Sequence, residues 1–172
     1  MFPTVHPDRD REAASRTPTV DEIVRFLERV PVAAPLSPAE LAELAFVADI
    51  LTVAEGERIL RFGDPGDAWF LLMYGTAIVS RNGVPLDTLA PGDCFGELAV
   101  LDGEHRTADV TAESDVVLVR VPREAFEALL QAGSLAAYKL VLGLTRLVAR
   151  RLRDLVAPQL PAHTDFQRGS PG

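Results

Sequence analysis

The chain has 172 residues, 48% of them hydrophobic, and a formal net charge of −8 at pH 7. This length fits one domain with a full hydrophobic core and short appended segments, and the acidic balance disfavours nonspecific binding to nucleic acid. No stretch approaches the ~18 apolar residues of a membrane helix, and the N-terminus holds no apolar signal core, so we expect a cytoplasmic protein with no membrane contact. The single cysteine, Cys94, excludes an internal disulfide framework.

The first part of the chain predicts two short helices after a flexible lead. Residues 1–19 are rich in proline and charge and show no apolar periodicity, which predicts a flexible N-terminal segment. Apolar residues then recur at helical spacing over residues 20–30, with Asp21 as a candidate cap, and Pro31 ends that helix. Ser37, followed by a proline, is typical of the capped start of a second helix.

Residues 50–121 show a different pattern, in which short β-rich runs are separated by turns. The strongest local signal is Asn82-Gly83, which stands between two apolar runs and predicts a tight β-hairpin. Many short strands at this spacing indicate a jelly-roll-like β-roll. With helices on either side of the strands, the predicted fold class is α+β, mainly β.

Two further helices follow the β-rich region. Pro122 opens the first, and a longer one spans residues 135–156. An apolar stripe near heptad spacing on the longer helix predicts a symmetric pair of such helices, with the charge of Arg151 reaching solvent beside the seam. The stripe consists of Val141, Leu144, Val148 and Leu155. Residues 157–172 are mostly polar and contain proline and glycine, which predicts a flexible tail and bounds the domain at residues 20–156.

The segment Phe95–Val110 holds the residues that say most about function. Gly96 lets the backbone approach a ligand closely, and the first amides of the short helix that begins at Glu97 are free donors that favour an anion. Arg106 can return to the same place and grip a phosphate with its planar fork. A carboxylate is a poor neighbour for an anion unless it accepts a hydrogen bond from a hydroxyl, so Glu97 indicates a sugar. These residues together predict a small anion with a phosphate and a ribose hydroxyl.

This segment resembles the phosphate-binding cassette of cyclic nucleotide-binding domains. That family includes protein kinase A regulatory subunits, cyclic-nucleotide-gated channels and the bacterial catabolite activator protein. The matching positions are Phe95, Gly96, Glu97, Leu98, Ala99, Leu101, Arg106, Ala108 and Val110. Strand and turn residues upstream also follow the family's spacing, so the resemblance covers about residues 24–156.

The resemblance implies a non-catalytic sensor that binds cAMP or cGMP and needs no cofactor and no metal. The ligand-binding residues that it implies are Phe95, Gly96, Glu97, Leu98, Ala99, Arg106, Thr107 and Ala108, with Leu155 and Val156 as an apolar lid over the base. It also implies that the last helix folds over the nucleotide and pairs with its twin. We therefore expect a homodimer through residues 135–156 that signals to an unidentified partner protein.

Three residues depart from the family's cassette. His105 stands where the family usually has proline, and Thr107 stands where many cAMP binders have alanine or serine. A threonine at this place resembles the guanine-contacting hydroxyl of cGMP-dependent kinases. Asp109 would repel the cyclic phosphate if it pointed inward. Strand alternation turns Asp109 away from the face of Arg106, but it turns Thr107 away as well.

Alternative functions remain open at this stage. An enzyme is disfavoured, because the three histidines lie far apart in the sequence and no catalytic constellation is visible. The main alternative is a degenerate fold that acts as a ligand-independent dimerisation or interaction module, which Asp109 and His105 favour. Taken alone, Arg106 suits a structural role beside a neighbouring carboxylate, and Glu97 suits stabilisation of a helix N-terminus. Direct DNA binding is not expected, because no helix-turn-helix segment follows residue 156.

Overall fold

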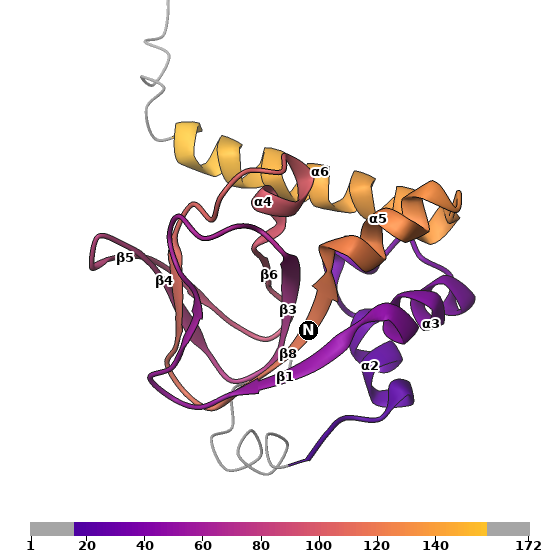
Figure 1. Cartoon of the computed structure of the whole chain (residues 1–172), viewed down its shortest axis with the longest axis horizontal. Helices are drawn as coiled ribbons and strands as arrows, with labels where there is room; N and C mark the ends of the chain where they lie inside the picture. The colour runs from indigo at the N-terminus through magenta and orange to yellow at the C-terminus, as the bar shows by residue number, and fades with distance from the viewer. Residues whose placement is uncertain (1–15, 158–172) are drawn as a thin grey trace, which may run out of the picture.

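Two four-stranded antiparallel sheets form the body of the protein within residues 16–157, the part that the computed structural model describes (Figure 1). The first sheet has the order β1-β8-β3-β6, with β1 (Asp49–Val53), β8 (Val116–Pro122), β3 (Ala68–Tyr74) and β6 (Cys94–Phe95). The second has the order β2-β7-β4-β5, with β2 (Arg58–Leu60), β7 (Asp109–Ala112), β4 (Ala77–Arg81) and β5 (Val84–Leu89). The predicted class, a mainly β roll with flanking helices, is confirmed. The predicted flexible segments lie almost wholly outside the described residues.

Side chains from both sheets fill the space between them. Phe70 and Leu118 of the first sheet belong to the same buried cluster as Leu60 and Val110 of the second. On its other face the first sheet carries the helices, and there Trp69 meets Phe126 edge to face, with ring centroids 6.2 Å apart. Strand β3 is therefore covered on both faces, which explains why its sequence is a continuous apolar run rather than an alternating one.

The hairpin predicted at Asn82-Gly83 joins β4 to β5. Both turn residues have positive φ, 51° at Asn82 and 77° at Gly83, which is the backbone that a two-residue turn of this twist requires. The resulting arm extends from the roll (Figure 1). Strand β5 is the edge of its sheet and is exposed except at Leu89, so one side of the arm faces solvent.

Within residues 16–157, three helices precede the strands: α2 (Val20–Leu27), the 3-10 helix η1 (Pro31–Ala33) and α3 (Pro38–Val47). Both α-helices begin with a capping box, capped by Thr19 and by Ser37. The prediction for Ser37 is confirmed, whereas Asp21 as the cap of the first helix was wrong. Thr19 takes that place because its hydroxyl accepts from the amide of Glu22, and its own amide donates to Oε2 of Glu22 at 2.9 Å.

In the described part of the chain, three helices lie within or after the β-rich region: α4 (Glu97–Leu101), α5 (Arg123–Gln131) and α6 (Leu135–Val156). Helix α6 runs along the upper edge of the molecule in Figure 1 and passes over α4. Its first half is buried through Leu140 and Leu144, and Lys139 Nζ lies 2.8 Å from Glu40 Oε2 of α3. Within the described residues, no helix is long and apolar enough to cross a membrane.

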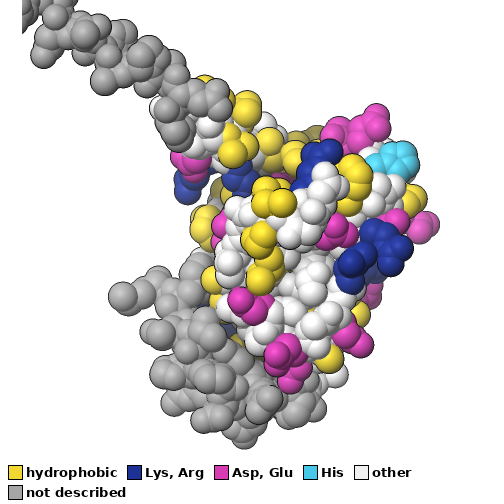
Figure 2. Space-filling view, turned by 90° about the vertical axis from the view of Figure 1, so that its left-hand side faces the viewer, with side chains coloured by type: hydrophobic (Ala, Val, Ile, Leu, Met, Phe, Trp, Pro, Cys, Tyr) yellow, Lys and Arg dark blue, Asp and Glu magenta, His cyan; other side chains and the backbone are white. Residues whose placement is uncertain are grey.

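The apolar stripe predicted on the last helix does not form one exposed seam. Leu144 is fully buried within the subunit, whereas Val141 and Val148 are half-buried. Leu155 is 71% exposed. The prediction was wrong because the heptad pattern alone does not reveal which helix face packs on the protein's own core. Figure 2 looks toward the C-terminal end of the described part of α6, where hydrophobic side chains lie next to basic and acidic ones. The exposed large apolar residues of α6 are Leu135, Tyr138, Leu142, Leu152, Leu155 and Val156.

Gly143 should resist replacement by alanine, although alanine is the better helix former by about 1 kcal/mol. A Cβ at Gly143 would lie 2.4 Å from the carbonyl oxygen of Val32 in η1, so the two elements would have to move apart. Overpacking of this kind costs ~1–3 kcal/mol, and we expect Gly143→Ala to lower the free energy of unfolding in urea. Arg150→Ala, at an exposed site in the same helix, is the control and should change it by less than about 0.5 kcal/mol. A stabilised Gly143→Ala variant would contradict the close packing of α6 on η1.

Candidate ligand-binding site

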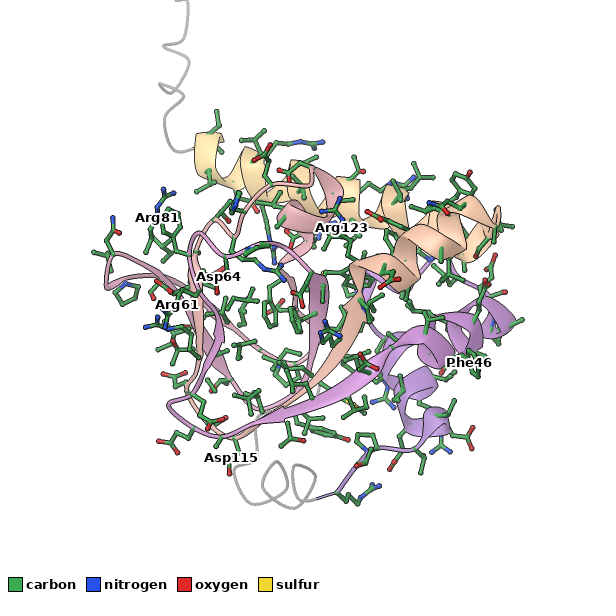
Figure 3. The ribbon with its side chains drawn as sticks, viewed as in Figure 1. Phe46, Arg61, Asp64, Arg81, Asp115 and Arg123 are labelled. Atoms are coloured by element: carbon green, nitrogen blue, oxygen red, sulfur yellow. The ribbon has the colours of Figure 1, made fainter. Side chains whose placement is uncertain are left out.

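A cavity of about 580 Å³ lies beside the second half of α6, a volume suited to a small-molecule ligand. Its walls come from β6 and α4, from the residues just before β7, from the β4–β5 arm and from α6. Arg81, one of the lining residues, lies on the β4–β5 arm in Figure 3. The cavity therefore joins segments that are far apart in sequence.

Gly96 makes the turn from β6 into α4. It caps the helix with φ 75°, in the left-handed region that favours glycine. A Cβ at this position would also lie 2.8 Å from Nη1 of Arg106. Both the backbone conformation and the close approach therefore require glycine, which explains the residue that the sequence pattern singled out.

Arg106 is the central charged group of the site and is only 3% exposed. Its Nη1 donates to the carbonyl oxygen of Gly96 at 2.8 Å and its Nη2 to Oδ1 of Asp67 at 3.0 Å. The ring of Phe70 lies 5.8 Å from the guanidinium carbon. Burial lowers the pKa of Arg106, and the Asp67 carboxylate opposes this shift. The guanidinium is thus a positive charge, held in a fixed orientation at the cavity wall.

Glu97 is as deeply buried as Arg106 and is bound by the last helix. Its Oε1 accepts a hydrogen bond from Nη1 of Arg151 at 2.7 Å. Nη2 of Arg151 donates to the carbonyl oxygen of Cys94 at 2.6 Å. The expectation that Arg151 extends into solvent beside a helix seam was wrong, because the buried carboxylate of Glu97 attracts it inward. Arg151 instead connects α6 to the start of α4.

Cys94 itself contributes only its backbone. Its side chain is 3% exposed, and burial raises the pKa of the thiol well above its ordinary value. The nearby carboxylate of Glu97 acts in the same direction. This matches the interpretation of Cys94 as a small packed residue rather than a reactive thiol.

The residues that depart from the family's cassette point in different directions. Asp109 turns away from the cavity: its Oδ1 accepts from the amide of Phe62 at 3.2 Å and lies 3.7 Å from Nη1 of Arg58. Thr107 lines the cavity, because β7 begins only at Asp109 and strict alternation does not extend back to Thr107. His105 is exposed and bridges to Pro65. The carboxylate that argued most strongly against anion binding therefore has other partners.

The structure brings together nearly all the residues that the sequence predicted for the site. Those that line the cavity are Phe95, Gly96, Glu97, Leu98, Ala99, Arg106, Thr107, Ala108 and Leu155. Val156 does not line it, because the helix turns its side chain by about 100° from that of Leu155. The sequence missed the walls from the β4–β5 arm and from α6: Val79, Arg81, Leu86, Asp87, Leu89, Arg151 and Asp154. The Asn82-Gly83 signal located the arm, but the curl of the roll determines which of its residues face the cavity.

Comparisons with known proteins agree with this arrangement. Residues 50–132 match the family model of the cyclic nucleotide-binding domain. The chain is 42% identical over 107 residues to a cAMP-dependent protein kinase regulatory subunit of Aspergillus niger, an alignment that covers 61% of this chain and 26% of that protein. It is also 38% identical over 127 residues to Glutaminase 1 of Bradyrhizobium diazoefficiens, covering 73% of this chain and 21% of the other. The chain thus spans about a quarter of the length of the curated relatives that it matches.

Solved structures give the same fold. The cAMP-bound protein PfPKA-R (141-441) superposes with a TM-score of 0.69 at 26% identity, covering 83% of this chain and 48% of that one. A cyclic nucleotide-binding domain from Methylobacillus flagellatus has a TM-score of 0.70 at 22% identity, which supports the fold alone, and covers 84% of this chain and 85% of its own. Residues 50–132 belong to the cyclic nucleotide-binding domain family. The resemblance found in the sequence is confirmed for this segment, and the family to which the segment belongs is one of non-catalytic regulatory domains.

Proposed function

We propose that the cavity binds a cyclic nucleotide, in the first place cAMP, and that the protein is a cytoplasmic sensor whose working unit is residues 20–156. The observation that carries this proposal is the deeply buried Arg106, fixed at the wall of a cavity of about 580 Å³. An adjacent anion stabilises a buried guanidinium, and the planar fork of the guanidinium suits a phosphate. The names of the relatives favour cAMP, since they include cAMP-dependent regulatory subunits and a cAMP-bound structure.

The phosphate would lie between Arg106 and the start of α4. The first amides of that short helix have no partners within the helix, and Gly96 keeps the backbone close to the guanidinium. Ala99 and Ala108 also line this part of the cavity, and their small side chains leave room for phosphate oxygens. The site thus combines one full positive charge with neutral donors.

The ribose hydroxyl would bind Glu97. This carboxylate has two oxygens, and Arg151 donates to one of them, Oε1. A ligand that hydrogen bonds to Glu97 therefore shares the carboxylate with α6. Any preference of the ligand for one position of Arg151 then shifts the population of α6 positions, which is the proposed signal.

The base would lie against the apolar part of the cavity, which Val79, Leu89 and Leu155 line. These side chains can stack on a purine without reading its polar edge. Thr107 is the residue whose hydroxyl could accept from the exocyclic amine of guanine, so cGMP is the second candidate ligand.

A homodimer through residues 135–156 is the proposed assembly. Exposed or half-exposed positions of α6 follow alternating steps of three and four, which is the heptad pattern of a coiled-coil seam. They are Leu135, Tyr138, Leu142, Thr145, Ala149, Leu152 and Val156. In a parallel pair, the basic residues Arg146 and Arg153 would face Val141 and Val148 of the second copy, whereas an antiparallel pair would bring arginines together.

We propose that the parallel dimer signals to a protein partner and does not bind DNA directly, in keeping with the net charge of −8.

One observation favours the alternative of a ligand-independent interaction module. Glu97 and Arg151 join α4 to α6 through the protein's own side chains, so this ion pair can hold the helix in one position. Thermal unfolding separates the two functions: a ligand that binds only the folded state stabilises it by about 2.7 kcal/mol at a hundredfold excess over Kd. A wild-type protein whose Tm does not change with millimolar cAMP or cGMP would favour the module.

Arg106→Ala should nearly abolish the binding of cAMP in a calorimetric titration. Truncating one partner of a buried, hydrogen-bonded charge pair costs ~2–5 kcal/mol of binding free energy. Arg61→Ala is the matched control, since Arg61 is an exposed arginine near the same loop (Figure 3) and should leave the affinity unchanged. Circular dichroism checks that both variants are folded. Wild-type affinity in Arg106→Ala would mean that the phosphate binds elsewhere.

Glu97→Ala should weaken cAMP binding by about 1.5–3 kcal/mol, the range for a hydrogen bond to a charged group. A 2′-deoxy cyclic nucleotide should show a similar loss with the wild type and little further loss with the variant. Strictly additive losses in this double cycle would rule out a contact between Glu97 and the 2′-hydroxyl.

Leu142→Glu should convert the dimer into a monomer in sedimentation experiments, because it places a charge at the centre of the proposed seam. Leu142 is 57% exposed in the subunit, so the change should leave the fold intact. Phe46→Glu is the control: Phe46 is 88% exposed on α3, away from α6 in Figure 3, and its replacement should not affect assembly. A monomeric wild type, or a dimeric Leu142→Glu variant, would contradict the seam.

A further inference from the structure

A chain of four alternating charges runs from β1 to the cavity. Asp49 Oδ2 lies 2.8 Å from Nη1 of Arg120 in β8, and Nη2 of Arg120 lies 2.9 Å from Oδ2 of Asp67. Asp67 Oδ1 in turn accepts from Nη2 of Arg106 at 3.0 Å. One carboxylate is therefore shared between two arginines, one oxygen for each. Neither Arg120 nor Asp49 lines the cavity.

The backbone around Asp67 is fixed, but its side chain is not fixed by burial. The amide of Arg106 donates to the carbonyl of Asp64 at 2.8 Å, the amide of Gly63 donates to the carbonyl of Arg106 at 2.9 Å, and the amide of Arg123 donates to the carbonyl of Asp67 at 2.8 Å. The Asp67 side chain is nevertheless 68% exposed. Its position against Arg106 therefore depends on its ion pairs.

An exposed carboxylate alone is a weak anchor for a guanidinium, because water and side-chain motion compete with the pair. Arg120 changes this situation. Its own side chain is only 27% exposed and is held on both sides, by Asp49 and by Asp67. Burial acts to raise the pKa of Asp67, but the hydrogen bond and charge of Arg120 outweigh it, with a smaller contribution from Arg106, so this pKa lies below its ordinary value. Asp67 is thus a counterion of Arg120 as much as of Arg106.

We propose that Arg120 is a positioning residue for anion binding, and this rests on the proposed function. By holding Oδ2 of Asp67, Arg120 keeps Oδ1 against Nη2 of Arg106 and so fixes the direction of the Arg106 fork. It also prevents Asp67 from closing on Arg106 with both oxygens, which would neutralise the guanidinium and compete with a phosphate. The guanidinium of Arg106 therefore keeps one orientation at the cavity wall, and its positive charge remains available to a phosphate.

Arg120→Gln tests this role in calorimetric titrations of the full chain with cAMP. We expect the affinity to fall about tenfold, which corresponds to ~1.4 kcal/mol. Arg123→Gln is the matched control, because Arg123 has a similar exposure and pairs with Glu127 instead of Asp67. In an Asp67→Asn background, Arg120→Gln should have little further effect, since Arg120 would act through Asp67.

A second measurement separates orientation from general damage to the fold. The two diastereomers of the cyclic adenosine phosphorothioate place sulfur at one or the other exocyclic phosphate position, so their affinity ratio reports how sharply Arg106 is aimed. Arg120→Gln should reduce the ratio seen with the wild type, whereas a variant that is merely less stable should keep it. An unchanged ratio and affinity in Arg120→Gln, or equal losses in Arg123→Gln, would overturn the proposal while leaving cyclic-nucleotide binding intact. A wild type that binds none of these nucleotides would overturn the proposed function, and with it any role of Arg120 in binding.

Discussion

The buried charge of Arg106 is the constraint on which the cavity side of the fold depends. Removing a guanidinium from water costs several kcal/mol unless hydrogen bonds and an opposite charge replace the hydration. The protein supplies the carbonyl of Gly96 and the carboxylate of Asp67, and each needs its own local structure. The Gly96 carbonyl is available because the chain turns there in the left-handed region. Asp67 can reach Arg106 because the loop that carries it packs closely on α4. A Cβ at the neighbouring Gly66 would lie only 2.3 Å from that of Ala99.

Helix α6 combines two kinds of contact. Its first half is part of the subunit's core, where Leu140 and Leu144 are fully buried and Gly143 lies against η1. Its second half reaches the cavity through Arg151, whose partners are Glu97 and the backbone of β6. The first half is therefore firmly held in the core, and the second half is joined to α4 by the ion pair of Arg151 with Glu97. A ligand that alters the hydrogen bonding of Glu97 acts on the part of the helix that is least firmly held.

The sequence predicted the cassette well because its chemistry is local. Gly96, Glu97 and Arg106 lie within eleven positions, so the turn and the arginine can meet without help from distant segments. Predictions failed where a side chain's direction depends on distant segments. Arg151 was expected in solvent, but a carboxylate 54 positions earlier draws it inward. Asp109 was ambiguous until its partners, the amide of Phe62 and the side chain of Arg58, came from β2 and the loop after it. No periodicity within one element carries this information.

The two buried charged residues that line the cavity, Arg106 and Glu97, already have protein partners, and this shapes what a ligand can do. Arg106 is paired with Asp67 and Glu97 with Arg151, so a nucleotide would enter a site of paired charges rather than of bare ones. Binding free energy would then be a difference between the new contacts and the weakening of the old ones, which lowers affinity but makes it sensitive to each partner. The partner of Arg106 belongs to a loop held by three backbone hydrogen bonds, whereas the partner of Glu97 belongs to a helix end with exposed neighbours. Of the two, the pair with Arg151 can give way more easily. A phosphate would therefore bind to the rigid Arg106 and a ribose to the more movable Glu97–Arg151 pair. The phosphate contact would then contribute most to ligand affinity, and the ribose contact would shift the position of α6.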